Sequence, residues 1–283
     1  MKTTEDFGNQ GALPTHPELL DWLAVEFRES GWDIKHMVRL IVTSQTYQQS
    51  SLPQPALEEW DPENRWLARQ ARFRLDAELV RDNALATSGL LNTKLGGRSV
   101  QPYQPEGYWA NINTFGVQGP GTTWTAETDD EQFRRGLYTY WKRTFLHPSM
   151  LAFDAPTRQE SEAQRAVSNT PSQALVLLND PTYVEAARVF AGRMINEGGP
   201  SVRDRLTWGY QQALSRTPRE TEIEVLAGLY HSQFAAFEAE ESSALQLIST
   251  GIAPVDAASP AELAAWTAVA RSIFNLHEMI TRY

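Results

Sequence analysis

Cysteine is absent from this chain of 283 residues. Its absence excludes disulfide bonds, thiolate metal sites, thiol nucleophiles and the CxxCH attachment of c-type haem within the chain. It does not fix a compartment, because reducing and oxidising spaces both tolerate cysteine-free domains. We therefore expect no cofactor in this chain.

Long apolar runs and net positive charge are also missing. No run approaches the ~18 apolar residues of a membrane span, and the opening KTTEDFGNQG lacks the apolar core of a signal peptide. The net charge of −10 argues against nucleic acid as a partner, because phosphate contacts need a basic face. The sequence thus predicts a soluble protein with no membrane span and no nucleic-acid partner.

Lysine is scarce. Only Lys2, Lys35, Lys94 and Lys142 are present, so 21 of the 25 basic residues (25 − 4) are arginines. Guanidinium groups suit fixed, bidentate pairs with carboxylates better than ammonium groups do. We interpret the bias as a set of ion pairs between helices in a compact acidic protein.

Helix-start signals are abundant and predict a mainly α, multi-helix globular fold. Asp33 precedes the helically spaced apolar residues of IKHMVRLIV, and Asp61-Pro62 predicts a long helix that ends near Gly89. Gly31 should end the helix before Asp33. Four capping boxes predict further helix starts, at Thr15–Glu18, Thr170–Gln173, Thr217–Glu220 and Ser259–Glu262.

The segment 92–131 changes in character. It is rich in glycine and proline and carries five aromatic residues, which argue against disorder. We expect one long ordered loop with a short strand pair at most, followed by a return to helix in EQFRRGLYTYWKRT. The expected organisation is a single domain, 1–283, in which residues 1–91 are helical, 92–131 form the loop and 132–283 are again helical. A second loop is expected within 239–258.

The standard sequence motifs of catalytic and metal sites are absent. There is no GxSxG, Walker A or GxGxxG motif, and His277-Glu278 lacks the second histidine of a zincin. The remaining histidines are scattered, so spacing gives no metal pair. We predict no metal site.

Two stretches carry candidate binding residues. Between Arg134 and Gln159, aromatic and charged residues close to the aromatic loop suggest a sugar-binding cleft, in which rings stack on sugars and charges meet hydroxyls or sulfate. The alternative is a buried Asp–Arg pair under an aromatic layer, and we favour it because ion-pair networks often mimic sites. The candidate ligand residues are Tyr103, Trp109, Tyr140, Trp141, Arg143, Asp154, Arg158 and Asn169.

The second stretch, SNTPSQALVLLNDP, places two helix starts in close succession. Thr170, Gln173 and Asp180 have capping roles there, which leaves Asn169 unexplained locally. A helix N-terminus at this point would also suit an anion. Helix capping is the interpretation we favour. On this interpretation the stretch turns the chain between two helices and packs beside Asp154 and Arg158.

Carboxylates give a weaker indication of catalysis. Glycosidase chemistry needs two carboxyl groups on opposite sides of one bond, a distance that no sequence reveals. Asp154 with Glu106 or Glu160 is the one combination worth testing.

Seven segments, taken in order, resemble a known family. It is the planctomycete-specific C-terminal domain known as domain of unknown function fifteen-fifty-three. The resemblance runs from about Thr3 to Arg193 and rests on THPELLDWLAVEF, GWDIKHMVRLIVTSQTYQQSS, DPENRWLARQARFRLDAELVRDNALATSGLL, GGRSVQPYQPEGYW, RRGLYTYWKRT, FDAPTRQ and SNTPSQALVLLNDPTYVEAAR.

The resemblance implies a large secreted protein in which a cytochrome-c-like module with haem c precedes this domain. It implies a periplasmic or extracellular location for the whole protein and an N-terminally incomplete domain here, with the upstream domains as partners. The family has no established activity. We expect a non-catalytic binding or scaffolding domain, with polysaccharide as a candidate ligand. The rival is a glycan-active enzyme that uses Asp154 with Glu106 or Glu160, and a third possibility is a helical cap for the upstream domains.

Overall fold

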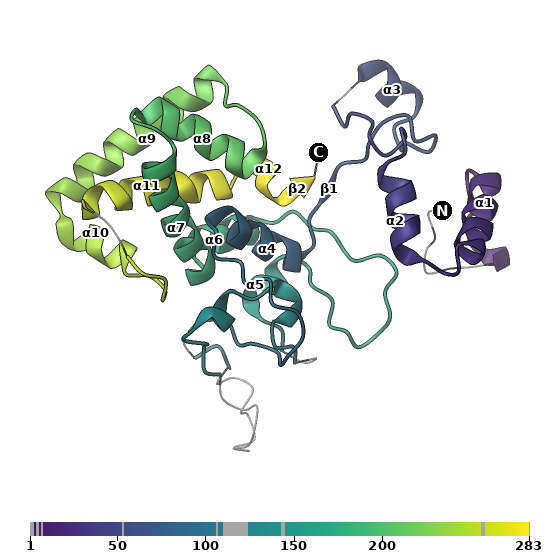
Figure 1. The fold of residues 1–283 in the computed structure, drawn as a ribbon, viewed down its shortest axis with the longest axis horizontal. Coiled ribbons are helices and arrows are strands. Elements are labelled where there is room, and N and C mark those ends of the chain that lie inside the picture. The colour runs from purple at the N-terminus through teal and green to yellow at the C-terminus, as the bar shows by residue number, and fades with distance from the viewer. Residues whose placement is uncertain are drawn as a thin grey trace. The chain divides into compact units, whose positions relative to one another are not determined.

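A computed structural model describes residues 3, 6, 8–52, 54–105, 107–109, 124–142, 145–255 and 258–282. The described chain is mainly helical, as predicted, and its one sheet has two short strands. It divides into two compact units. The colours of Figure 1 follow the residue number from the N-terminus to the C-terminus. Unit 1 comprises Met1–Arg74, Ser161–Arg165 and Thr281–Tyr283, and unit 2 comprises Leu75–Glu160 and Ala166–Ile280.

Unit 1 contains three short helices and the small sheet. The 3-10 turn η1 (Gly8–Gln10) precedes α1 (Pro17–Glu29), α2 (Ile34–Val42) and α3 (Pro55–Trp60). Strand β1 (Phe73–Arg74) pairs antiparallel with β2 (Thr281–Arg282), so that Phe73 lies opposite Arg282. None of the residues of α1, α2 or α3 is buried.

Unit 2 contains the remaining helices. They are α4 (Ala77–Ser88), α5 (Pro148–Ala152), α6 (Pro171–Asn179), α7 (Pro181–Glu197), α8 (Val202–Leu214), α9 (Glu220–Ala239), α10 (Glu241–Ile248), α11 (Pro260–Phe274) and α12 (His277–Ile280). Two 3-10 turns, η3 (Asp130–Phe133) and η4 (Gly136–Tyr138), lie between α4 and α5.

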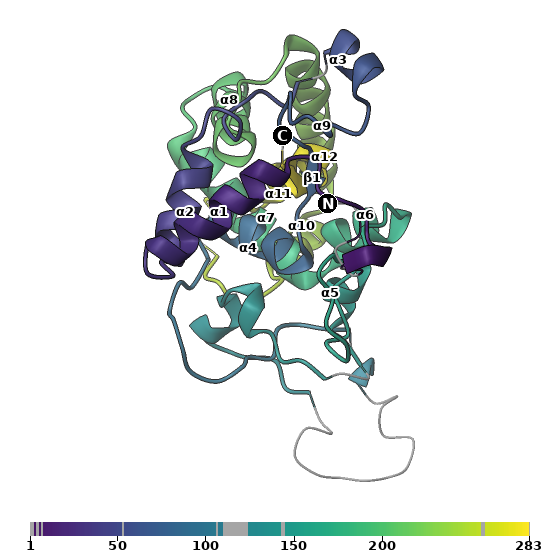
Figure 2. The same ribbon diagram turned by 90° about the vertical axis from the view of Figure 1, so that its right-hand side faces the viewer.

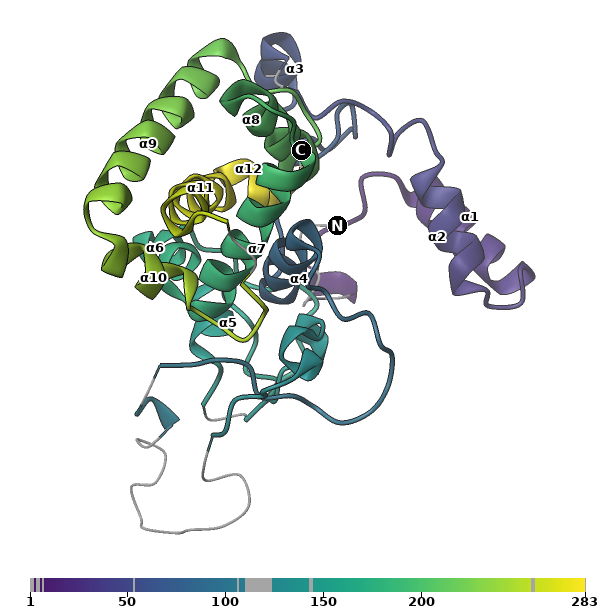
Figure 3. The ribbon, with the colours of Figure 1, turned by 60° about the vertical axis from the view of Figure 1, so that its left-hand side comes forward.

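The core of unit 2 is built around α11. Figure 3 shows this helix nearly end-on, with α7, α9 and α10 around it. Phe190 of α7 stacks between Trp208 and Phe274, with ring centres 5.8 and 5.4 Å away. On another side of α11, the ring of Trp266 lies 4.6 Å from that of Tyr230. Most of α11 is buried because three helices pack on it.

The irregular segments of unit 2 lie between α4 and α6. They extend to one side of the helices together with α5, as both Figure 1 and Figure 2 show. In the described stretches of 92–131 the chain forms no α-helix, which agrees with the expected loop. Single parallel bridges join Asn92 to Arg134 and Val100 to Thr139.

Several predicted helix boundaries are confirmed. The Asp33 carboxylate accepts a hydrogen bond from the His36 backbone N–H, and Ser259 caps α11 through the N–H of Glu262. Asp180 caps α7 through the N–H of Thr182. Helix α1 ends before Gly31, and α4 ends at Gly89, which adopts the left-handed conformation (φ 87°). Polar caps and glycines act locally, and these signals were therefore readable from sequence.

The long helix predicted from Asp61 is wrong in its first half. The Asp61 carboxylate accepts hydrogen bonds from the N–H groups of Arg65 and Trp66, which closes a turn. Asn64 and Leu67 then adopt positive φ values of 50° and 54°, which a right-handed helix cannot contain. The helix begins only at Ala77.

The helix predicted in EQFRRGLYTYWKRT is also wrong. The backbone there bonds to the opposite segment, with Val100 N–H donating to Tyr138 O at 2.8 Å and Tyr140 N–H donating to Val100 O at 2.7 Å. Gly136 lies so close to Glu78 that an added Cβ would sit 2.7 Å from its Cα. Backbone hydrogen bonds to a distant segment therefore take the place of the hydrogen bonds that an α-helix would form here.

Two of the remaining boundaries also need correction. His16, not Thr15, is the N-cap residue of α1, and it makes no side-chain cap. Arg219 rather than Thr217 is the N-cap of α9. Thr170 is the N-cap residue of α6, as predicted, although it makes no side-chain cap. The loop expected within 239–258 follows α10, in the described residues of the second half of that range.

Candidate functional site

Most of the predicted ligand residues lie in unit 2. Arg143, and Glu106 of the catalytic alternative, fall outside the described residues. The other seven contribute to three separate groups of contacts. Those groups are an aromatic cluster, a cation–π pair and a polar corner.

The aromatic cluster contains Trp109 and Tyr140. Trp109 is buried, and its ring centre lies 4.9 Å from that of Trp124, 6.2 Å from Tyr140 and 5.7 Å from Phe145. The rings meet edge-on or tilted, which is the favourable geometry for aromatic pairs. Because these faces contact one another, the cluster is a small core beneath the loop.

Tyr103 contacts a buried histidine, His147, whose ring centre lies 5.7 Å from that of Trp124 in the cluster. The carbonyl of Tyr103 accepts a hydrogen bond of 2.6 Å from His147 Nε2, and Nδ1 of the same ring lies 2.9 Å from Ser149 Oγ. Burial lowers the pKa of His147 to about 4. The imidazole is therefore neutral, with its proton on Nε2 and with Nδ1 accepting from the serine hydroxyl.

The hydroxyl of Tyr103 lies near a buried ion pair of α7. Burial, with the neighbouring Glu185 carboxylate as second cause, raises the pKa of Tyr103. Glu185 is completely buried, and its Oε1 accepts hydrogen bonds of 2.6 Å from the N–H groups of Ile252 and Ala253. Arg188, 3.7 Å from Glu185, donates to the carbonyl of Ala253 at 2.7 Å. The pair holds the loop after α10 against α7.

The cation–π pair consists of Trp141 and Arg158. The Arg158 guanidinium carbon lies 3.8 Å from the centre of the Trp141 ring, and Arg158 Nη2 lies 3.7 Å from Glu78 Oε1. The Arg158 side chain is 40% exposed. Aromatic and charged groups thus come together at the surface, whereas the interpretation favoured from the sequence was a buried Asp–Arg pair under an aromatic layer.

The polar corner is formed by Asp154 and Ser168. The Asp154 carboxylate accepts hydrogen bonds from the backbone N–H and the hydroxyl of Ser168, both at 2.8 Å. Gln173 Nε2 donates to the Ser168 carbonyl at 3.1 Å. The capping box predicted between Thr170 and Gln173 is therefore wrong, because Gln173 reaches back to Ser168. Asn169, next to this corner, is exposed.

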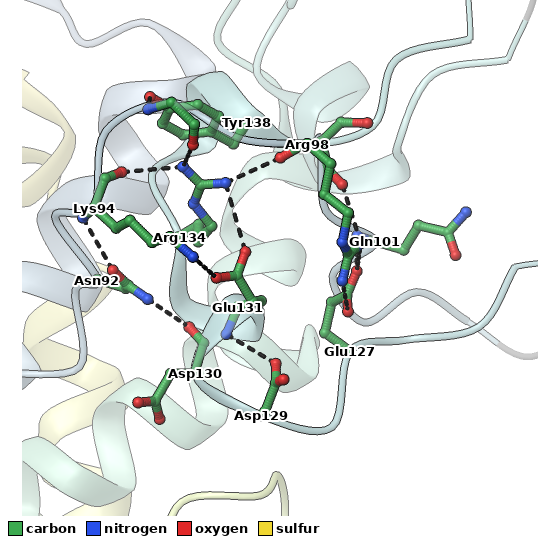
Figure 4. Close-up of polar contacts among 12 residues, drawn as sticks. Asn92, Lys94, Arg98, Gln101, Glu127, Asp129, Asp130, Glu131, Arg134 and Tyr138 are labelled. Atoms are coloured by element: carbon green, nitrogen blue, oxygen red, sulfur yellow. Dashed lines mark hydrogen bonds and ion pairs between the residues drawn. The ribbon is translucent and has the colours of Figure 1, made fainter.

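Arg134 is a central residue that the sequence did not single out as a site. Its nearly fully buried guanidinium donates to the carbonyls of Arg98 at 2.9 Å, Lys94 at 3.0 Å and Gly96 at 2.5 Å, as Figure 4 shows. The Tyr138 ring covers it, with the ring centre 3.6 Å from the guanidinium carbon. The Tyr138 hydroxyl accepts from the Gly96 N–H at 2.7 Å.

Ion pairs surround this arginine at the surface. Lys94 Nζ lies 2.9 Å from Glu131, and Arg98 forms a bidentate pair with Glu127 at 2.7 and 2.8 Å (Figure 4). The Glu127 carboxylate also accepts from the Gln101 N–H. Hydrogen bonds from Arg98 lower the pKa of Glu127, against the opposing effect of partial burial. Both ends of the described loop are thereby tied to η3 and η4.

Arginine side chains bind main-chain carbonyls at several other points in unit 2. Arg81 donates to Gln132 O at 2.6 Å, Arg193 to Thr87 O at 2.8 Å and Arg271 to Leu178 O. A guanidinium offers five N–H donors and is weakly hydrated, which suits such clamps. The predicted ion pairs exist near the surface, for example Arg205 with Glu262 at 2.7 Å, but the buried arginines mostly hold loops. The arginine-rich, lysine-poor composition was the signal for this.

The described residues were compared with what a metal site and a membrane span require. They contain no group of three or more histidine, aspartate or glutamate side chains that could hold a metal ion. None of their helices is long and apolar enough to cross a bilayer.

These observations define a mainly helical chain whose buried arginines hold the described parts of the aromatic-rich segment 92–131 in place. The chain belongs to the family described as protein of unknown function (DUF1553), which matches residues 1–230. The resemblance inferred from the seven sequence segments is thereby confirmed at the level of the family. Neither a curated protein nor a solved structure matches the chain.

Proposed function

We propose that this chain is a non-catalytic binding or scaffolding domain of a larger secreted planctomycete protein, working beside a cytochrome-c-like module. The proposed place in a larger secreted protein with a cytochrome-c-like module rests on the resemblance of the sequence to its family. The haem c belongs to that other module, because this chain has no cysteine to attach it. The location of the whole protein is then periplasmic or extracellular.

The observation that carries the non-catalytic assignment is the use of the buried arginines. Arg81, Arg134 and Arg188 are almost fully buried, and each donates to main-chain carbonyls. A catalytic cation would point at a substrate site, whereas these groups direct their donors at the fold itself. Such a set of clamps supports a rigid platform.

Polysaccharide is the ligand we propose for this platform. The supporting surface comprises Trp141 and Arg158, with the exposed Asn169 beyond the polar corner, while the buried Glu78 carboxylate contacts the Arg158 guanidinium. It offers an aromatic ring, a half-exposed guanidinium and an amide, and sugar hydroxyls can hydrogen-bond to the last two groups. Net negative charge favours neutral over sulfated chains.

The enzymatic alternative has less support. Asp154 is engaged by Ser168 through both of its oxygens, and Glu160 is exposed. Neither residue lines the cavity around Trp22 and Trp66, the one around Asn179 and Arg271, or the one around Leu91 and Asp130. A general acid and base must flank one bond in a cleft, so these two carboxylates suit an ordering role and a surface role.

The test combines binding with turnover. The purified chain is titrated calorimetrically with neutral and sulfated polysaccharides, and release of new reducing ends is followed in parallel. We expect saturable binding of a neutral chain, no new reducing ends, and at least fivefold weaker binding for Arg158→Ala. The matched control is Arg203→Ala, which removes an exposed arginine of α8.

New reducing ends that disappear in Asp154→Asn would establish the enzyme instead. Absence of binding to every polysaccharide would reject the proposed ligand. Scaffolding would then be tested alone, by pull-down of the cytochrome-c-like segment encoded with this chain.

A further inference from the structure

A large cavity lies within unit 1, and none of the candidate ligand residues named above lines it. Its volume is about 720 Å³, which falls in the usual range of small-molecule sites. Helix α1 contributes Leu19, Trp22 and Leu23, and α2 contributes Leu40 and Ile41. The segments 44–49 and 64–71 supply the rest of the wall.

The wall is largely apolar and aromatic. Trp22 and Trp66 are 50% and 60% exposed, although tryptophan is normally well covered in a folded chain. The ring of His16 meets the Trp66 ring edge-on, with centres 5.7 Å apart. Tyr47 adds another ring to the wall. Flat apolar faces of this kind suit a planar or aliphatic ligand body.

The segment that carries Trp66 is fixed by a specific set of hydrogen bonds. The Asp61 carboxylate is buried and accepts from the N–H groups of Arg65 and Trp66 at 3.0 and 2.8 Å. The Asn64 amide donates to the Arg69 carbonyl at 2.7 Å and accepts from the Arg69 N–H. Asn64 and Leu67 hold positive φ values within this turn. Unfavourable backbone conformations held by such contacts occur frequently at ligand sites.

The charges around the cavity point to a neutral ligand. No aspartate or glutamate lines it, and its one arginine, Arg69, donates to the carbonyls of Asp61 and Pro62 at 3.0 Å each. A guanidinium engaged in this way is poorly placed to bind an anion. Neither a cation nor an anion therefore finds an available partner charge among the lining residues.

Gln49 indicates which polar group a ligand of this cavity should carry. It lines the cavity, and its Oε1 is buried and accepts no hydrogen bond within the described chain. A buried acceptor without a donor is costly, so a ligand that donates to it recovers the lost hydrogen bond. The requirement is for a hydroxyl or N–H group on the ligand.

From these features we propose that unit 1 binds a neutral, largely apolar small molecule whose hydroxyl or N–H group donates a hydrogen bond to Gln49 Oε1. Trp22 and Trp66 cover the ligand body. The inference is independent of the platform in unit 2, because the two sets of residues share no member.

The experiment uses three probes that share one ring system. These are 2-naphthol, which is neutral and donates; 2-methoxynaphthalene, which is neutral and cannot donate; and 2-naphthoate, which is charged. Each is titrated calorimetrically into the full chain at neutral pH. We expect saturable 1:1 binding of 2-naphthol, at least fivefold weaker binding of the ether, and weaker binding still of the carboxylate.

Variants locate the site. Gln49→Leu should reduce the affinity for 2-naphthol to that for the ether, while the ether itself is unaffected. Gln45→Leu, at an exposed position in the same turn, is the matched control and should change neither. Trp22→Ala should weaken both neutral probes.

Equal affinity for 2-naphthol and its ether would overturn the role of Gln49. Tightest binding of the carboxylate would overturn the neutrality argument, and non-saturable or absent binding would overturn the site. If circular dichroism shows that Gln49→Leu is unfolded, the ranking of the three probes on the native chain and the effect of Trp22→Ala decide the question.

Discussion

The guanidinium of Arg158 lies over the ring of Trp141, with its central carbon 3.8 Å from the ring centre. Glu78 approaches the same guanidinium to 3.7 Å. Arg158 itself adopts a positive φ of 60°. One side chain thus covers an aromatic ring at the surface and ties the turn after α5 to α4.

Replacement of Arg158 by alanine should lower the free energy of unfolding by about 1 kcal/mol, because partly exposed cation–π contacts are worth ~0.5–2 kcal/mol. Urea unfolding, followed by far-ultraviolet circular dichroism, measures this change in the free energy of unfolding. Arg158→Lys should recover some of the loss, since an ammonium still attracts the ring. An unchanged midpoint in Arg158→Ala would show that the contact contributes nothing.

Arg134 should be far more important for stability. Arg134→Met leaves the carbonyls of Lys94, Gly96 and Arg98 without this donor, and we expect a loss of roughly 3 kcal/mol. The control is Arg203→Met, which removes a pair with Glu220 whose side chains are 56% and 60% exposed. That loss should be too small to resolve, because exposed ion pairs contribute little to stability. Similar losses in the two variants would contradict the clamp.

His147 should make stability depend on pH below neutrality. Burial lowers its pKa from 6.5 to about 4, so the folded chain resists protonation. As the pH falls from 6.5 to 4, the unfolded state takes up a proton that the folded state does not. The free energy of unfolding should therefore decrease by about 3 kcal/mol over this range. Above pH 6.5, His147 should change the free energy of unfolding very little.

The measurement for His147 is urea unfolding at half-unit pH steps. His147→Gln should be less stable at neutral pH yet show a shallower slope between pH 6.5 and 4. His231→Gln, at an exposed position, is the control and should keep the slope of the unaltered chain. An identical slope in His147→Gln would remove this histidine as the cause.

Two glycines should respond oppositely to alanine. A Cβ on Gly136 would lie 2.7 and 2.8 Å from the Cα and carbonyl oxygen of Glu78, and backbone atoms cannot move aside easily. Gly136→Ala should thus cost about 1–3 kcal/mol. Gly228, within α9, has no atom within 4 Å of the added carbon, so Gly228→Ala should stabilise by ~0.5–1 kcal/mol. Thermal midpoints of the two variants test this contrast, and a shift in the same direction would contradict it.

Sequence signals that act over a few residues were reliable here. Asp33, Asp180 and Ser259 cap helices with side chains that reach only two or three residues along the chain. Gly89 ends α4 because glycine tolerates the left-handed conformation. Trp141 and Arg158 were both named as candidate ligand residues from the sequence, but their contact with each other was not predicted.

Contacts between distant segments could not be read in this way. Whether Asp61 would start a helix or close a turn depended on which N–H groups its carboxylate would meet. The candidate residues Trp109 and Tyr140 lie in an internal aromatic cluster because Trp124 and Phe145 cover them from elsewhere in the chain.

By itself, then, the sequence determined a mainly helical protein, its family and its reliance on arginine. Those properties follow from composition and from interactions within a few residues. The tertiary structure decided what the arginines hold, as with Arg134 on the carbonyls of 94–98 and Arg188 on that of Ala253. Carbonyl groups are present in every residue, so no sequence pattern marks the ones that a distant guanidinium will find.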